Sequence, residues 1–382
     1  MKRGIATFTL DTGVCPPWLF ERMVKLGRSM AEVLVDEYGP DEFIKRIADP
    51  VWFQSLGTVL AFDWNASGLT TILTAALKEA IRDQEKDLGI FIAGGKGATS
   101  RKTPDQISDW GNRLNFSSNQ TRNLVRSSKM SAKVDSSLVQ DGYTLYHHAF
   151  FFSKNGAWTV VQQGMNTENS TARRYHWYSE NFESFVEEPH TGIASQAFHK
   201  KALNLVAKAS HKNRNISLEL ANSGYLTLME DIEILRRHSS SLTKMITLKT
   251  GDEQLTLASF PGVEFNHHKV EMEDFTKSKY LDKILARVSE EAPNNYEDLI
   301  AIKGVGGKTM RALSLVSEII YGADPSYEDP ARYSFAHGGK DATPYPVDKE
   351  TYDQTIQILQ AAVRKANINP VEKDKALRRI SK

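Results

Sequence analysis

Two β-rich runs that flank a tight turn constrain the fold of this chain more than any other feature. Residues 143–152 and 157–164 are rich in aromatic and β-branched side chains, which favour strands. Between them stands Asn155-Gly156, the dipeptide most typical of a short hairpin turn. The pattern therefore predicts two antiparallel strands joined by a two-residue turn.

The register of this hairpin decides which polar side chains meet. A two-residue turn places His148 opposite Gln163. Side chains alternate along a strand, so His147 and Gln162 are expected on the opposite face. Imidazole can ligate a metal or transfer a proton near neutral pH, and glutamine amides can hold a phosphate or a water. We therefore treat these four side chains as candidate catalytic residues, and a satisfied polar role in the core stays open for each.

Strands and helices alternate along the first part of the chain, and helical spacing dominates the second. Residues 59–62 and 89–93 are predicted strands, and residues 67–80 carry apolar side chains at helical spacing. These patterns predict a mixed α+β fold, in which an N-terminal α/β domain contains the hairpin and an α-helical C-terminal domain follows. The predicted divisions are an α/β domain over 1–195, a helical linker or middle region over 196–290 and a last region with a basic tail over 291–382.

Composition limits the classes of function. The 382 residues suffice for about two or three domains, and 48 Lys and Arg stand against 47 Asp and Glu. With a net charge of only +1, any attraction for nucleic acid must come from local patches. The single cysteine, Cys15, excludes an internal disulfide and an iron–sulfur cluster and fits a reducing, cytoplasmic compartment. We see neither a signal peptide nor an apolar run of about 18 residues, which predicts no membrane partner.

Residues 296–322 form the most specific motif. Two short apolar helical patterns flank a glycine turn, and the glycines leave backbone N–H groups uncovered where the second helix begins. The order of residues resembles the helix-hairpin-helix of DNA-binding proteins, which holds a phosphate without reading sequence. A glycine turn used only for packing is the alternative. The residues that the resemblance assigns to DNA binding are Lys303, Gly304, Val305, Gly306, Lys308 and Thr309.

A Gly- and Pro-rich loop over 323–347 and then Asp348 follow this motif. The same order is found in a superfamily of DNA glycosylases. In that resemblance Lys308 matches the lysine that attacks the sugar, and Asp348 matches the aspartate that activates it. A phosphate clamp for Lys308 and a helix N-cap for Asp348 are the alternatives.

Further candidates lie in the first half of the chain. Asp63 follows a predicted strand, and Lys96 lies in a glycine-rich loop after another, which is where α/β sheets place ligands. Arg173, Arg174 and His176 belong to a basic and aromatic cluster. Arginine neutralises phosphate and aromatic rings stack on unpaired bases, so the two arginines are predicted DNA contacts. A solvated face beside core aromatics is the alternative.

Several blocks together identify the chain as a member of a family of unknown function that is spread through archaea and bacteria. The resemblance covers nearly the whole chain and implies no reaction. The blocks include Phe62-Asp63-Trp64, Tyr146-His147-His148, Val160-Val161-Gln162-Gln163-Gly164-Met165-Asn166, Ala172-Arg173-Arg174-Tyr175-His176-Trp177 and the segment from Gly304 to Asp353.

These observations favour a DNA-binding protein that is a metal-dependent nuclease, acting in DNA repair on structured or single-stranded DNA. A divalent Mg or Mn ion would polarise the phosphoryl oxygen and supply hydroxide, and its candidate ligands are Asp63, His147 and His148. One alternative is a glycosylase or AP lyase that uses Lys308 and Asp348. Another is a DNA-binding scaffold without catalysis. A homodimer, and RNA in place of DNA, also remain open.

Overall fold

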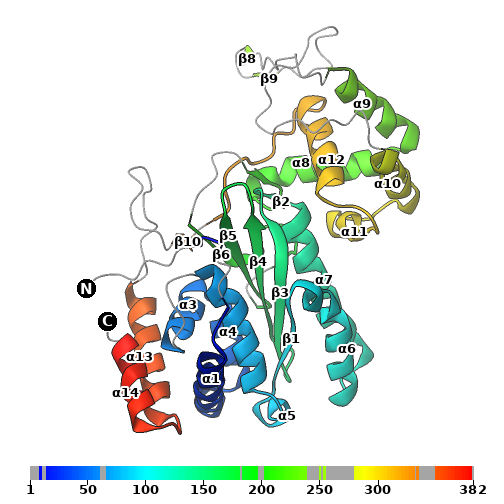
Figure 1. The fold of residues 1–382 in the computed structure, drawn as a ribbon. Coiled ribbons are helices and arrows are strands. Elements are labelled where there is room, and N and C mark those ends of the chain that lie inside the picture. The colour runs from blue at the N-terminus through cyan, green and yellow to red at the C-terminus, as the bar shows by residue number, and fades with distance from the viewer. Residues whose placement is uncertain are drawn as a thin grey trace.

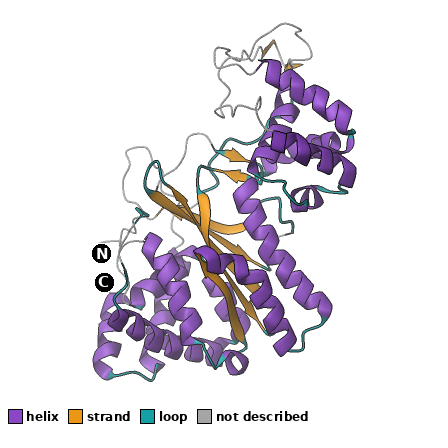
Figure 2. Cartoon of the chain, turned by 45° about the vertical axis from the view of Figure 1, so that its right-hand side comes forward, coloured by secondary structure: helices purple, strands orange, loops and turns teal. Residues whose placement is uncertain are grey.

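The structure is a computed structural model, which describes residues 8–10, 14–60, 66–180, 183–196, 202–238, 249–250, 253–254, 279–331, 333–334 and 349–380. A central sheet lies between two helical layers, and a further group of helices lies beyond one end of the sheet (Figures 1 and 2). The predicted α+β class is therefore confirmed.

The central sheet has six strands in the order β1-β3-β4-β5-β6-β10. The first five are antiparallel to their neighbours, and β10 runs parallel to β6. Because helices cover both faces, both sides of the strands are buried, and apolar side chains from the sheet belong to the clusters on each side. Their bounds are β1 Ile90–Lys96, β3 Thr144–Ser153, β4 Trp158–Asn166, β5 Thr171–Tyr178, β6 His190–Ser195 and β10 Tyr333–Ser334.

The turn between β3 and β4 is one residue longer than predicted. The Ser153 N–H donates to the Ala157 carbonyl oxygen at 2.9 Å, so the turn consists of Lys154, Asn155 and Gly156. Gly156 has a φ of +100°, the left-handed conformation that closes a three-residue hairpin turn. The predicted hairpin is confirmed, and its two-residue turn is wrong.

The longer turn moves the cross-strand partners of residues 147–152 by one residue. His148 pairs with Gln162 and His147 with Gln163, so the predicted pairing of His148 with Gln163 is wrong. His147 and His148 still point to opposite faces, as alternation requires. Each histidine therefore shares its face with the glutamine that the sequence placed on the other side.

The first helices of the chain and the last two form the layer on one face of the sheet (Figure 1). Ala149, Phe151 and Val161 belong to the same buried cluster as this layer. The bounds are α1 Pro17–Tyr38, α2 Pro40–Ile47, α3 Pro50–Val59, α4 Ala66–Ala80, the short α5 Glu85–Leu88, α13 Lys349–Lys365 and α14 Pro370–Ile380.

Two predictions change in this layer. The predicted strand over 59–62 starts inside a helix, because α3 ends at Val59, and residues 61–65 lie outside the described part. The predicted unit 291–382 is divided, because α13 and α14 return to pack on α1 and α3. Leu359 and Ala376 are buried there, so apolar side chains of α13 and α14 anchor the basic tail.

The second layer covers the other face and carries the candidate site. It consists of the 3₁₀ helix η1 Gly97–Lys102, α6 Thr103–Arg113 and α7 Ser118–Ser137. Phe150, Phe152 and Trp177 belong to the cluster that this layer buries. A capping box begins α7, in which Ser117 and Gln120 bond each other's backbone N–H groups.

The remaining helices form a separate group beyond the upper end of the sheet in Figure 1. Their bounds are η2 Lys208–Ser210, α8 His211–Asn222, α9 Tyr225–His238, α10 Lys279–Glu291, α11 Tyr296–Ala301 and α12 Gly307–Ile319. A ladder of β2 Val139–Gln140 with β7 Leu203–Asn204 joins the group to the second layer, and β8 Lys249–Thr250 pairs with β9 Glu253–Gln254.

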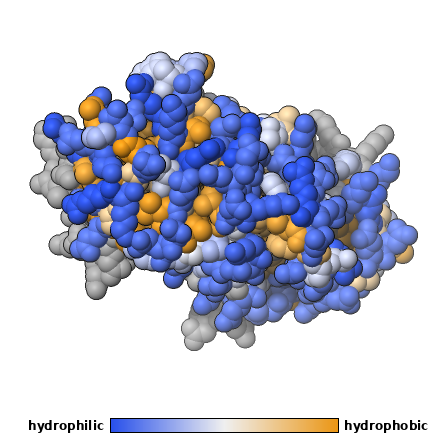
Figure 3. Space-filling view, turned by 90° about the horizontal axis from the view of Figure 1, so that it is seen from below, coloured by the Kyte–Doolittle hydropathy of each residue, from blue (hydrophilic) through white to orange (hydrophobic). Residues whose placement is uncertain are grey.

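Within the described ranges, no helix has the length and apolar character needed to span a membrane. The face in Figure 3 is largely hydrophilic, with smaller apolar patches between the polar side chains.

Candidate functional site

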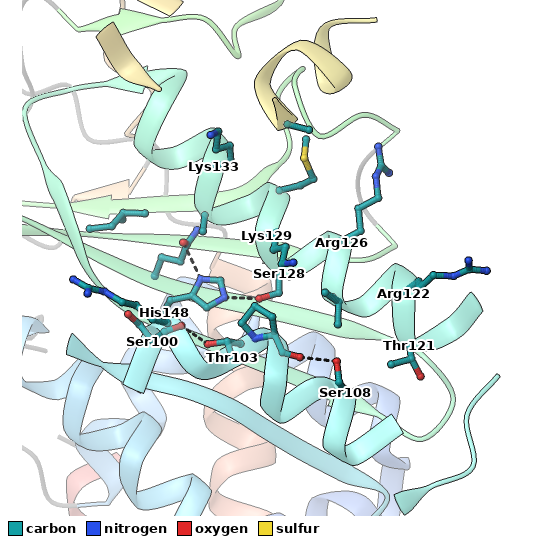
Figure 4. Close-up of a pocket in the computed structure, with 18 of the residues that line it drawn as sticks. Ser100, Thr103, Ser108, Thr121, Arg122, Arg126, Ser128, Lys129, Lys133 and His148 are labelled. Carbon is teal, nitrogen blue, oxygen red and sulfur yellow. Dashed lines mark hydrogen bonds between the residues drawn. The ribbon is translucent and has the colours of Figure 1, made fainter. Parts of the chain in front are cut away.

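A stripe of cations runs along α7. Arg122, Arg126, Lys129 and Lys133 are spaced three or four residues apart, which places them on one side of the helix (Figure 4). The two arginines and Lys129 are exposed. Lys133 is half-buried, and burial lowers the pKa of its ammonium group.

These side chains line a cavity of about 960 Å³ between η1, α6, α7 and β3. The Arg and Lys side chains around it are Arg101, Arg122, Arg126, Lys129 and Lys133, and the described lining residues include no Asp or Glu. We call this cavity the cationic pocket. Charges of one sign inside a concavity concentrate ions of the opposite sign. The pocket is therefore a local basic patch in a chain whose net charge is close to zero.

Ser128 and His148 lie in the wall of the cationic pocket. Ser128 Oγ is 2.9 Å from His148 Nε2, and His148 Nδ1 is 2.9 Å from Gln162 Oε1 (Figure 4). An amide oxygen only accepts hydrogen bonds, so Nδ1 of His148 carries the proton and donates. Nε2 is then the acceptor, and the Ser128 hydroxyl donates to it.

Asp135 anchors this chain of hydrogen bonds from inside the protein. Gln162 Nε2 donates to Asp135 Oδ2 at 2.5 Å, and Trp177 Nε1 donates to the same oxygen at 3.0 Å. His190 Nε2 lies 2.5 Å from the other carboxylate oxygen. Because the indole N–H can only donate, these contacts fix the orientation of the Gln162 amide and, through it, the proton position on His148.

Burial lowers the pKa of His148 to about 4, although the hydrogen bond with Gln162 raises it in part. The imidazole is therefore neutral near pH 7 and can accept a proton. A hydroxyl, a base and a group that orients the base are the parts required for nucleophilic catalysis.

The predicted helix-hairpin-helix is present. Val305 is 1% exposed and belongs to the same buried cluster as the inward side chains of α11 and α12, as the motif predicts. Gly304 has a φ of +97°, and a Cβ there would lie 2.3 Å from Ile284 Cδ1. Gly306 is the N-cap of α12 without a side-chain cap, and a Cβ there would meet no described atom within 4 Å. The N-terminus of α12 is therefore open to an anion.

The two lysine side chains at this hairpin are accessible, whereas the threonine side chain is buried. Lys303 and Lys308 are exposed. Thr309 is 3% exposed, so its predicted contact with DNA is wrong for the side chain.

The cationic pocket and the hairpin adjoin each other. Ala301, the last residue of α11, lines the pocket, and the hairpin begins at the next residue. Arg126 on the pocket wall forms an ion pair with Glu297 of α11 at 2.8 Å. The cationic pocket and the helix-hairpin-helix are therefore neighbours that meet at α11.

The other predicted catalytic side chains lie on the opposite face of the sheet. His147 Nε2 is 3.1 Å from Thr74 Oγ1 of α4, and Gln163 Nε2 donates to the Ser67 carbonyl oxygen at 2.9 Å. His176 Nδ1 meets the Ile47 carbonyl oxygen at 3.1 Å. Lys96 is exposed at the end of β1, with its Nζ 5.9 Å from the ring centre of Tyr146. The predicted set is thus divided, and only His148 and Gln162 join the chain of hydrogen bonds behind the pocket.

Arg173 and Arg174 are both buried, which corrects their predicted contact with DNA. Arg173 forms ion pairs with Asp141 at 2.8 Å and Asp329 at 2.7 Å. Although burial lowers the pKa of Arg173, the two carboxylates raise it above its ordinary value. These ion pairs occupy the Arg173 guanidinium inside the protein, so it is not available to a phosphate outside.

Arg174 lies on the opposite face from Arg173. It donates to the Pro50 carbonyl oxygen at 3.2 Å, and its guanidinium lies 4.7 Å from the ring centre of Phe53. Burial lowers the pKa of Arg174 to about 9.

The predicted metal ligands do not meet among the described residues. His147 and His148 face opposite layers, so they cannot hold the same ion. Asp63 lies outside the described residues, as does Asp348 of the alternative lysine-aspartate pair. In the described part of the chain no three His, Cys, Asp or Glu side chains form a group that could hold a metal.

Sequence reasoning missed α7 altogether. Its signals were present, because the cation stripe follows helical spacing and Ser128 and Asp135 are seven positions apart, two turns along the same face. The serine and the aspartate look like ordinary helix-surface residues until the sheet buries them. Only the contact with β3 and β4 gives them partners.

One comparison with known proteins identifies a family. A family model described as "Protein of unknown function (DUF763)" matches residues 4–347. No curated protein and no solved structure matches the chain. The match spans nearly all of the sequence and agrees with the resemblance seen in its blocks. The chain belongs to the DUF763 family.

Proposed function

We propose that this protein binds DNA through its phosphates and cleaves phosphodiester bonds in the cationic pocket. The observation that carries the proposal is the adjacency of the pocket to the helix-hairpin-helix. Both features recognise phosphate rather than base edges, so recognition depends on DNA structure more than on sequence. A pocket beside the hairpin that holds the DNA backbone suits an unpaired or distorted strand better than a regular duplex.

The cleavage step remains a prediction from the chemistry of the site. His148 supplies a neutral imidazole at the pocket wall, and the surrounding cations stabilise charge on a phosphoryl group. Mg²⁺ or Mn²⁺ stays part of the proposal, since phosphate oxygens can contribute ligands to such an ion. We place the protein in the cytoplasm, where its one cysteine remains reduced.

Binding measurements with paired variants test the proposal. Lys129→Ala removes a pocket cation, and we expect it to weaken binding to every DNA sequence and to reduce the salt slope by about 0.9. Gly306→Glu places a negative charge where the phosphate approaches, and we expect a larger loss of DNA affinity than in Lys129→Ala. Lys25→Ala on α1 and Gly306→Ala are the matched controls, because Lys25 is exposed on the other layer and the surroundings of Gly306 admit a methyl group.

The assay uses fluorescence anisotropy with single-stranded, duplex, flap and abasic DNA at several salt concentrations. Cleavage is followed on the same substrates with Mg²⁺, Mn²⁺ or EDTA. Unchanged affinity in folded Lys129→Ala and Gly306→Glu proteins would exclude the proposed surface. A borohydride-trapped adduct with abasic DNA that Lys308→Ala abolishes would instead support a glycosylase or lyase.

A further inference from the structure

The hydrogen bonds behind the cationic pocket have one consistent direction. Asp135 accepts from Gln162, Gln162 accepts from His148, and His148 accepts from Ser128. Each residue therefore orients the next, and the last one in the chain is a hydroxyl that lines the pocket. A serine needed only for packing would satisfy its hydroxyl on the main chain, as neighbouring Ser131 does at the carbonyl oxygen of Ser128, 3.1 Å away.

We propose that Ser128 is a catalytic nucleophile, that His148 is its general base, and that cleavage passes through a covalent phosphoserine. This inference rests on the proposed function, which supplies DNA as the substrate, and it adds Ser128 Oγ as the atom that attacks the phosphate. Nothing in the hydrogen-bond chain requires a metal ion for the first step, because the base already contacts the hydroxyl.

The reaction balances with groups that the site contains. Ser128 Oγ forms a bond to phosphorus while its proton passes to His148 Nε2. The phosphorus–oxygen bond to one deoxyribose breaks, and the imidazolium returns the proton to that leaving oxygen. Water then attacks phosphorus, with its proton taken by His148, and the Ser128 oxygen leaves and regains a proton.

The cations of the pocket have a defined part in this scheme. Lys129 follows Ser128 directly, and Lys133 lies one turn further along α7 on the pocket side. Positive groups placed around a phosphoryl centre offset the charge that develops as the serine oxygen attacks. Asp135 does not line the pocket, and the Gln162 amide is taken up by its hydrogen bonds to His148 and Asp135. We therefore assign both as positioning residues.

A fluorophosphonate probe tests the nucleophile without any DNA. Its phosphorus accepts a serine oxygen while fluoride leaves, so the adduct is stable and visible by mass spectrometry. We expect the wild-type protein to gain one adduct, which peptide mapping places on Ser128. Ser128→Ala should remain unlabelled, and His148→Gln should react at least about 100-fold more slowly because glutamine cannot take the proton. Ser131→Ala, a buried serine on the same side of α7, is the matched control and should react at the wild-type rate.

The pH dependence of labelling tests the positioning residue. The rate should fall as the pH drops through the pKa of His148, about 4, where the base becomes protonated. Gln162→Met removes the hydrogen bond that raises this pKa, so the midpoint should move to lower pH. A role of Gln162 in packing alone would slow labelling without moving the midpoint. Absence of label on Ser128, or an equal rate in a folded His148→Gln protein, would overturn the proposal.

A parallel experiment with labelled DNA separates this inference from the proposed function. After quenching in detergent, the wild-type protein should carry covalently bound DNA, whereas Ser128→Ala should bind DNA with wild-type affinity and form none. If Ser128→Ala cleaves at the wild-type rate, the nucleophile is wrong and the DNA-cleaving function stands. If the probe labels Ser128 while no DNA is cleaved with Mg²⁺, Mn²⁺ or EDTA, the nucleophile stands and its substrate is not DNA.

Discussion

The two faces of the central sheet carry similar side chains in different chemical surroundings. Toward α7, His148 lies between the Ser128 hydroxyl and Gln162. Toward α4, His147 meets Thr74 at one nitrogen, and its Nδ1 has no hydrogen-bond partner among the described residues. The comparison teaches that the groups at both nitrogens of a histidine decide which proton transfers are open to it.

Adjacent arginines on β5 repeat this contrast. Arg173 faces the α7 layer and pairs with two carboxylates, whereas Arg174 faces the α4 layer and donates to neutral oxygens of Gln54, Thr70 and Pro50. Neighbouring positions on one strand thus differ in electrostatics as much as in direction.

The largest expected effect separates the two histidines. His148→Gln should lower the rate of DNA cleavage by about 10²- to 10⁴-fold, because it removes the proton acceptor and keeps hydrogen-bonding capacity. His147→Gln should lower the cleavage rate far less, since the hydrogen bond of His147 goes to Thr74 in the other layer. Single-turnover cleavage and anisotropy binding measured on both variants would check this. A larger loss in His147→Gln, with binding retained, would transfer the active site to the α4 face.

The next effect separates the two arginines. Arg173→Met leaves Asp141 and Asp329 buried without their cation, and we expect the free energy of unfolding to fall by about 3–5 kcal/mol. Arg174→Met leaves only neutral acceptors without their donor among the described contacts. We therefore expect the free energy of unfolding to fall by about 1–3 kcal/mol. Urea unfolding of both variants measures the difference. Equal losses of unfolding free energy in the two variants would show that the carboxylates beside Arg173 do not make it differ from Arg174.

The smallest effect is common to both faces. Burial lowers the pKa of His147 to about 3 and that of His148 to about 4, whereas the ordinary value is 6.5. Below pH 6.5 the unfolded chain binds protons that the folded protein does not, so stability is complete above 6.5 and falls as the pH drops toward 4. Each histidine should contribute about 1.4 kcal/mol per pH unit in this window.

Urea unfolding at pH 7 and pH 5 checks this dependence. His147→Gln and His148→Gln should each reduce the loss of stability between the two pH values by about 2 kcal/mol, as the slope per pH unit implies. A variant with the wild-type pH dependence would mean that its histidine is already protonated or exposed in the folded protein.

Features set by local interactions could be predicted from the sequence. The hairpin around Asn155-Gly156 and the helix-hairpin-helix at Gly304 follow from turn residues and apolar spacing within a short stretch of chain. The turn length was not predictable, because Asn-Gly fits both a two-residue and a three-residue turn, and that one residue reversed which glutamine each histidine shares a face with.

The sequence by itself determined the hairpin around Asn155-Gly156, the glycine turn before α12 and a net charge close to zero. The tertiary structure decided which polar groups are buried and which share a pocket. Ser128, His148 and Asp135 come from a helix and a strand whose pairing depends on long-range packing. Local propensity carries no information about such pairings, because burial and hydrogen-bond partners arise only when distant segments close over the sheet.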